Sequence, residues 1–170
     1  DYRPDDSVVV TPLKVNETTV RELRESLMMF FVGYTRSASD LLGDQKKKSE
    51  AGDGGMIEAL HFTKQLGFEI AKVLEAGDVL RFGELMHEHW MRKRARSAGM
   101  SSGQIDSFYD LARGEGGAIG GKLVGAGGSG FLLLQARDRN RLRKVMTAAG
   151  LMEMDFSFDF DGSVVQMRNR

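Results

Sequence analysis

The sequence contains no cysteine, so disulfide bridges, zinc–thiolate sites, iron–sulfur clusters and cysteine nucleophiles are all excluded. It also lacks any run of about 18 uninterrupted apolar residues, the length that a transmembrane helix needs. An excess of one charge is missing as well, because 24 basic residues balance 24 acidic ones. A neutral chain is not drawn as a whole to nucleic acid or to an anionic membrane, so we expect neither as a partner.

The residues that are present are typical of a folded domain. A chain of 170 residues, 41% hydrophobic and 28% charged, has the size and composition of one compact domain rather than of a disordered segment. It begins at Asp1 without an initiating methionine, and no charged start followed by an apolar run indicates a signal peptide. We therefore expect residues 1–170 to be one domain of a longer cytoplasmic protein.

Strands are predicted towards both ends of the chain, where β-branched or apolar residues form short runs. The segments are 7–11, 27–32, 118–124, 131–134 and 156–165. In the last of these, phenylalanines alternate with polar residues and are followed by Asp161-Gly162, which predicts a hairpin.

Helices are predicted between these strands from apolar residues at three- and four-residue spacing and from capping residues. One begins near Ser37, two lie at 59–76 and from Asp78 to Trp90, one opens at Ser101-x-x-Gln104, and one covers 138–149. Gly77 separates the second from the third, which predicts a helical hairpin. This order of elements predicts an α+β fold, in which helices pack on one face of a mainly antiparallel sheet.

Glycine is concentrated in one place. Nine of the 21 glycines lie between Gly114 and Gly130, and residues 125–130 match Gly-x-Gly-x-x-Gly. A dinucleotide-binding loop would need a single helix over 129–149, which the apolar run 131–134 and the capping residue Asp138 argue against. A P-loop needs Gly-Lys-Ser/Thr at its end, and Ser129-Gly130-Phe131 does not provide it.

The third interpretation places the glycine segment between two antiparallel strands. Its backbone N–H groups could then face an anion directly, and Lys122 would add a positive charge suited to phosphate. The alternative is a tight connection that only lets two elements pack closely. The residues alone leave both interpretations open.

The stretch from Gly120 to Phe131 resembles the third conserved motif of the GHMP kinases, a superfamily that includes galactokinases, homoserine kinases and mevalonate kinases. Residues 82–90 and 155–159 are similar to its heptose-phosphate kinase branch. The sequence departs from the motif at Val124, where Thr or Ser is commoner, and at Ser129, where Gly is commoner. Neither change removes a backbone donor.

The resemblance implies a domain of the GHMP kinase C-terminal type, with a ferredoxin-like sheet. The ATP-binding loop of that family and its catalytic acid belong to an N-terminal domain, which this sequence lacks. The resemblance therefore implies no catalytic residue in residues 1–170 and no kinase activity of the chain alone. ATP and Mg²⁺ would be held mainly by that missing domain. The nucleotide phosphates would lie near residues of this chain, namely Lys122, Gly125, Ala126, Gly127, Gly128, Ser129 and Gly130.

The remaining partners implied by the resemblance are a sugar or sugar phosphate, similar to a heptose phosphate, and the N-terminal kinase domain of the same polypeptide. A homodimer is compatible with it too. The rival hypothesis is a stand-alone α+β module that binds a phosphorylated metabolite without catalysis. An upstream segment carrying a Gly-Leu-Gly-Ser-Ser-like loop would favour the kinase.

Two further segments are candidates for contact with the substrate. Thr35, Arg36 and Ser37 follow a predicted strand at the start of a helix, where backbone amides and an arginine suit a sugar phosphate. Trp90 and Lys93 could form part of a lid, with the indole on the sugar and the ammonium near phosphate. The alternative for Trp90 is packing in the core.

His87 and His89 do not indicate a metal site, because two histidines two residues apart on a helix point to different faces. The basic residues around 92–96 and 137–144 come without an aromatic pattern or a nucleic-acid motif, so a solvated helix face is the better interpretation. We therefore predict no metal ligand in this chain.

Overall fold

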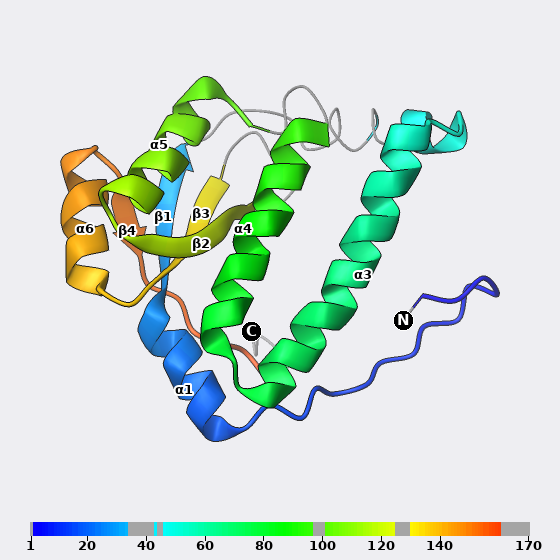
Figure 1. Cartoon of the computed structure of the whole chain (residues 1–170), viewed down its shortest axis with the longest axis horizontal. Helices are drawn as coiled ribbons and strands as arrows, with labels where there is room; N and C mark the ends of the chain where they lie inside the picture. The colour runs from blue at the N-terminus through cyan, green and yellow to red at the C-terminus, as the bar shows by residue number, and fades with distance from the viewer. Residues whose placement is uncertain (1, 34–42, 44–45, 97–100, 125–129, 161–170) are drawn as a thin grey trace, which may run out of the picture.

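The computed structural model describes residues 2–33, 43, 46–96, 101–124 and 130–160, with the side chains of residues 95 and 96 left out. Within these residues no helix is both long and apolar enough to cross a membrane. Figure 1 shows a sheet with α5 and α6 on one side and the long helices α4 and α3 on the other.

Within the described residues the sheet has four strands in the order β2-β3-β1-β4, and each neighbouring pair is antiparallel. The strands are β1 (Leu27–Gly33), β2 (Ala118–Val124), β3 (Gly130–Ala136) and β4 (Met152–Met154). The helices are α1 (Glu17–Ser26), α3 (Gly54–Ala76), α4 (Val79–Arg96), α5 (Gly103–Gly114) and α6 (Arg139–Ala148). The α+β fold with an antiparallel sheet is therefore confirmed.

The main core lies between the first face of the sheet and the helices α5 and α6. Alternate strand residues such as Phe30, Leu132 and Leu134 point to this face and have no exposed surface. They pack with Tyr109 of α5 and Leu142 of α6. Because side chains alternate along a strand, the residues between them point to the second face of the sheet.

A smaller core cluster lies on the other side of the sheet. It joins Leu23 of α1, Leu27 of β1 and Met86 of α4, and Leu133 of β3 packs against it. α3 and α4 form the predicted helical hairpin, in which Gly77 ends α3 at a φ of 77°. A residue with a side chain adopts this left-handed conformation only at a cost, so glycine is required there.

Helix α4 lies directly against the edge strand β2. A Cβ atom added to Gly120 of β2 would overlap the carbonyl oxygen of Gly83 on α4 and lie 3.1 Å from the Cβ of His87. The absence of a side chain at Gly120 therefore allows the helix backbone to touch the strand backbone. This contact fixes the position of β2, from which the glycine segment continues.

Several predicted elements are wrong or shifted. Residues 7–11 form no strand, and a single bridge joins Tyr2 to Val8, because no strand of the sheet lies beside this segment. The last strand is Met152–Met154 rather than part of 156–165; residues 155–160 form no strand, and 161–165 lie outside the described residues. The helix predicted from Ser101 begins one residue later, since Ser102 is its N-cap.

Helix α1 was missed because its sequence is mostly polar. Asn16 caps it by accepting a hydrogen bond of 2.8 Å from the N–H of Thr19. Only Thr19 and Leu23 of this helix are buried, so tertiary contact at two positions holds a helix that carries no long apolar stripe. The helix predicted near Ser37 falls on residues outside the described ones.

Candidate functional site

The glycine segment connects two strands that pair with each other. β2 ends at Val124 and β3 begins at Gly130, and Val124 lies opposite Phe131 in the antiparallel register. The interpretation of two antiparallel strands flanking the segment is therefore confirmed. The dinucleotide-binding alternative is wrong, because Gly130–Ala136 is a strand and the next helix starts only after Asp138, whose side chain accepts from the N–H of Arg141.

Of the residues predicted to lie near a nucleotide, the structure describes Lys122 and Gly130. Gly130 has a φ of 112°, a conformation that favours glycine. Residues Gly125, Ala126, Gly127, Gly128 and Ser129 lie outside the described residues.

Lys122 lies near the end of β2, three positions before Gly125, and pairs with Leu133 across the sheet. Its side chain is half-buried, and among the described residues no hydrogen bond or ion pair engages its ammonium group. The ammonium therefore supplies a positive charge that no described carboxylate neutralises. Such a cation beside a run of backbone N–H groups is suited to an anionic ligand.

Lys122 lines a cavity of about 380 Å³ between the helical hairpin and the second face of the sheet. The other lining residues are mostly apolar and come from α3, α4, β2 and β3: Thr63, Leu66, Gly67, Ile70, Phe82, Met86, His89, Val124 and Leu133. The sequence predicted the helical stripes but not this cavity. Finding it requires the strand register, which decides that Lys122 and Leu133 share one face.

A second polar feature joins α4 to α5 beside Gly120 of β2. The Tyr109 hydroxyl is 2.8 Å from Nδ1 of His87, and their rings are nearly parallel at 5.9 Å. Burial raises the pKa of Tyr109 to about 12. Burial, together with the positive charges of Arg113 and Arg94, lowers the pKa of His87. At neutral pH the phenol therefore stays protonated, and its O–H donates a hydrogen bond to the neutral imidazole.

Trp90 requires a correction as a candidate sugar contact. Its side chain has no exposed surface and packs in the main core, where its ring lies 5.9 Å from that of Tyr109. Because α4 packs against β2, the indole points into the protein and offers no face to a ligand. The core-packing alternative is correct, and α4 up to this residue is part of the core rather than a lid.

The other predicted substrate contacts are not brought together in the described part of the chain. Lys93 follows Trp90 by one helical turn and is half-buried. Thr35, Arg36 and Ser37 lie outside the described residues, directly after β1. Among the described residues, no three histidine or acidic side chains form a group that could hold a metal ion.

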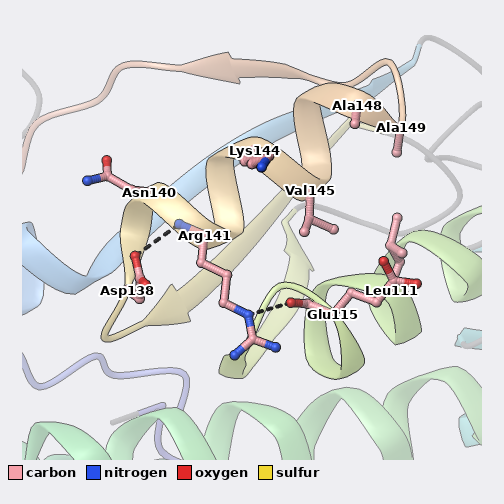
Figure 2. Close-up of a pocket in the computed structure, with 9 residues that line it drawn as sticks. All are labelled: Leu111, Glu115, Asp138, Asn140, Arg141, Lys144, Val145, Ala148 and Ala149. Carbon is pink, nitrogen blue, oxygen red and sulfur yellow. Dashed lines mark hydrogen bonds between the residues drawn. The ribbon is translucent and has the colours of Figure 1, made fainter.

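A larger cavity of about 840 Å³ lies elsewhere, in an open groove between α5 and α6 (Figure 2). Arg141 spans it, and its Nε donates to the Glu115 carbonyl oxygen at 2.6 Å. None of the predicted site residues lines this groove. The arginine joins two core helices here, and we assign the groove no role in the site.

The chain is similar in sequence to kinases of known activity. Residues 70–150 match the family model described as GHMP kinases C terminal. Over 158 residues the chain is 28% identical to D-glycero-alpha-D-manno-heptose 7-phosphate kinase of Campylobacter jejuni, which covers 91% of this chain and 45% of that protein. It is 25% identical over 129 residues to L-fucokinase/L-fucose-1-P guanylyltransferase of Bacteroides fragilis. This match covers 74% of this chain and 13% of that protein.

Solved structures share the fold. The mevalonate kinase of L. major, in complex with R-mevalonate, matches with a TM-score of 0.67 and 20% identity over 86% of this chain and 42% of that one. A D-glycero-D-manno-heptose 1-phosphate kinase from Bacteroides thetaiotaomicron matches with a TM-score of 0.57 and 24% identity. This match covers 90% of this chain and 39% of that one. The chain thus spans less than half the length of each relative named here. The family match covers the end of α3, all of α4 and α5, the β2–β3 pair and α6, which is less than half of the chain, and in this region the chain is similar to the C-terminal domain of the GHMP kinases.

Proposed function

We propose that residues 1–170 are the carboxyl-terminal domain of a two-domain, ATP-dependent kinase that phosphorylates a hydroxyl group of a sugar or sugar phosphate. Similarity to a heptose 7-phosphate kinase along 91% of the chain supports an acceptor of the heptose-phosphate kind. The observation that carries the proposal is the antiparallel β2–β3 pair, which ends at the glycine segment and bears Lys122 without a described counter-charge. We expect the kinase in the cytoplasm.

In this proposal residues 125–130 face the nucleotide phosphates with backbone N–H groups, and Lys122 adds a point charge. Phosphoryl transfer depends mainly on positioning and on neutralising charge. An ammonium group without a carboxylate partner fits a triphosphate, which carries several negative charges. In this proposal Mg²⁺ is bound chiefly by the other domain of the kinase. When bound, Mg²⁺ neutralises charge on the phosphate oxygens.

The acceptor would contact this domain beyond the glycine segment. Thr35, Arg36 and Ser37 follow β1 in the sequence, and β1 pairs in the sheet with β3, the strand that begins at Gly130. Gly33 pairs with Gly130 in the register. The end of β1 beside Gly130 supports the proposal that Arg36, three residues further along the sequence, binds an acceptor phosphate, with Lys93 as a second cation. Arginine is suited to that task because its guanidinium can donate two parallel hydrogen bonds.

The chain alone should be inactive, because it contributes only part of the site and no catalytic residue. The test is ATP-dependent phosphorylation of a panel of sugars and sugar phosphates by the intact polypeptide and, in parallel, by the 170-residue chain. We expect turnover by the intact polypeptide only. Phosphorylation by the chain alone would contradict the assignment as half a site. An intact polypeptide that binds a sugar phosphate without consuming ATP would favour the metabolite-binding module instead.

A further inference from the structure

A pocket lies at the end of β1 that is remote from the glycine segment. Gly33, the last residue of β1, pairs with Gly130, whereas Leu27 and Met28, its first residues, line a cavity of about 260 Å³. A strand rises about 3.4 Å per residue, so the cavity and Gly130 lie at opposite ends of the sheet, roughly 20 Å apart. No residue of the proposed nucleotide or acceptor site lines this pocket.

The walls of the pocket come from elements that are far apart in the sequence. Arg24 belongs to α1 and Arg139 to the start of α6, while Glu153 and Met154 belong to β4. The segment after β4 runs back towards α1 (Figure 1), and its Phe158 packs against the smaller core cluster. This segment provides the remaining lining residues, namely Asp155, Phe156, Ser157 and Phe158.

Arg139 has no carboxylate of its own in this pocket. Both oxygens of the Glu153 carboxylate accept from Arg143, whose Nη2 lies 3.0 Å from Oε1. Arg139 reaches that same oxygen only at 3.5 Å, and its other terminal nitrogen donates to the Arg24 carbonyl oxygen at 3.3 Å. Its Nε atom is buried, and no described residue accepts a hydrogen bond from it. A buried N–H group without an acceptor is unfavourable, so this guanidinium is suited to an additional anion.

Arg24 supplies a second guanidinium group. It lies over the ring of Phe158, with its Cζ atom 5.7 Å from the ring centre. Among the described residues no carboxylate forms an ion pair with it. Asp155 also lines the pocket and is exposed. Together with Arg143, the arginines around the pocket outnumber its carboxylates, which are Glu153 and Asp155, so the local charge favours an anion.

The rest of the wall is apolar. Leu27 and Met28 are buried, and the rings of Phe156 and Phe158 lie edge to face with their centroids 6.1 Å apart. A carbon skeleton can lie against these side chains while its charged group meets the arginines. The volume of about 260 Å³ is below the roughly 300–1,000 Å³ of sites for drug-sized ligands. A body of about one ring therefore fits better than a whole nucleotide.

We propose that this pocket, which we call the Arg24–Arg139 pocket, binds a small organic anion. A phosphate or carboxylate group is held by the two guanidinium groups, and the carbon body lies against Phe156 and Phe158. Phosphate and carboxylate share the feature on which recognition depends, namely oxygens placed to accept two hydrogen bonds from one guanidinium. The inference goes beyond the proposed function and does not rest on it, because the pocket uses none of the residues assigned to the nucleotide or the acceptor.

Calorimetric titration of the intact polypeptide tests the proposal with four probes: phenyl phosphate, benzoate, inorganic phosphate and benzyl alcohol. We expect phenyl phosphate or benzoate to bind at least about tenfold more tightly than inorganic phosphate, which lacks the ring, and than benzyl alcohol, which lacks the charge. The tighter of the two organic anions identifies the charged group. If neither binds, the proposal is overturned. Equal affinity for inorganic phosphate contradicts the apolar wall and equal affinity for benzyl alcohol contradicts the role of the arginines, so either result overturns it too.

Three variants locate the binding site. Arg24→Gln removes a guanidinium that makes no ion pair among the described residues, so the thermal unfolding temperature should stay constant. Binding of the organic anion should weaken about tenfold or more. Arg21→Gln, at another exposed arginine of α1 that does not line the pocket, is the matched control and should bind normally. Lys122→Met should bind normally as well. Binding that is kept in Arg24→Gln, or lost in Lys122→Met, would place the anion elsewhere and overturn the proposal.

Discussion

The Tyr109 hydroxyl lies 2.8 Å from Nδ1 of His87, and this hydrogen bond joins α5 to α4 beside Gly120 of β2. Tyr109→Phe removes the donor and leaves the half-buried imidazole nitrogen without its partner. We expect a loss of about 1–2 kcal/mol in the free energy of unfolding, measured by urea denaturation of the chain. Tyr2→Phe, at a tyrosine that is 91% exposed, is the control and should change nothing. Equal stability of the two variants would contradict the role of this bond.

The same pair predicts a dependence of stability on pH. The pKa of His87 is lowered in the folded chain, mainly by burial, from the ordinary value of 6.5. Below about pH 6.5 the unfolded chain therefore binds a proton that the folded chain resists, and the free energy of unfolding falls as the pH decreases. His87→Asn keeps an acceptor near the Tyr109 hydroxyl but cannot titrate. Its stability should fall less between pH 7.5 and pH 5.5 than that of the unmodified chain, and parallel curves would refute the assignment.

The contact of α4 with β2 predicts a large effect of a small substitution. Gly120→Ala places a Cβ atom on the Gly83 carbonyl oxygen, so the helix or the strand must move. We expect a loss of about 1–3 kcal/mol, as in other overpacked cores, together with a raised KM for ATP in the intact polypeptide because β2 carries Lys122. Gly103→Ala is the control, since a Cβ there meets nothing within 4 Å. If both alanine variants unfold at the same urea concentration, the contact does not constrain the strand.

The sequence predicted those parts of the fold that local signals determine. Gly77 and Asp78 marked the turn between α3 and α4, and the apolar runs on either side of the glycine segment marked β2 and β3. Trp90 shows where such signals end: helical spacing indicates that a side chain points inward, but only the packing of α4 on β2 buries it completely. The cavity beside Lys122 could not be predicted, because it depends on a register between Lys122 and Leu133 that only the assembled sheet provides.

Gly67 should be a position where stability can be gained. It lies inside α3, its φ is not in the left-handed region, and an added Cβ meets nothing within 4 Å. Gly67→Ala should therefore raise the free energy of unfolding by about 0.8–1 kcal/mol, because alanine loses less backbone entropy in a helix than glycine. Thermal unfolding of the chain measures this. A loss of stability would show that the helix needs glycine for a reason other than space.

Lys122 provides the sharpest test of the proposed nucleotide site. Lys122→Met keeps most of the side chain that lines the cavity and removes its charge, so the thermal unfolding temperature should stay nearly constant. In the intact polypeptide we expect the KM for ATP to rise about tenfold, the loss of one charge-assisted contact of roughly 1.4 kcal/mol. Lys144→Met on α6, which lines the groove between α5 and α6, is the matched control and should leave the KM unchanged. An unchanged KM in the Lys122 variant, with normal folding, would remove this lysine from the site.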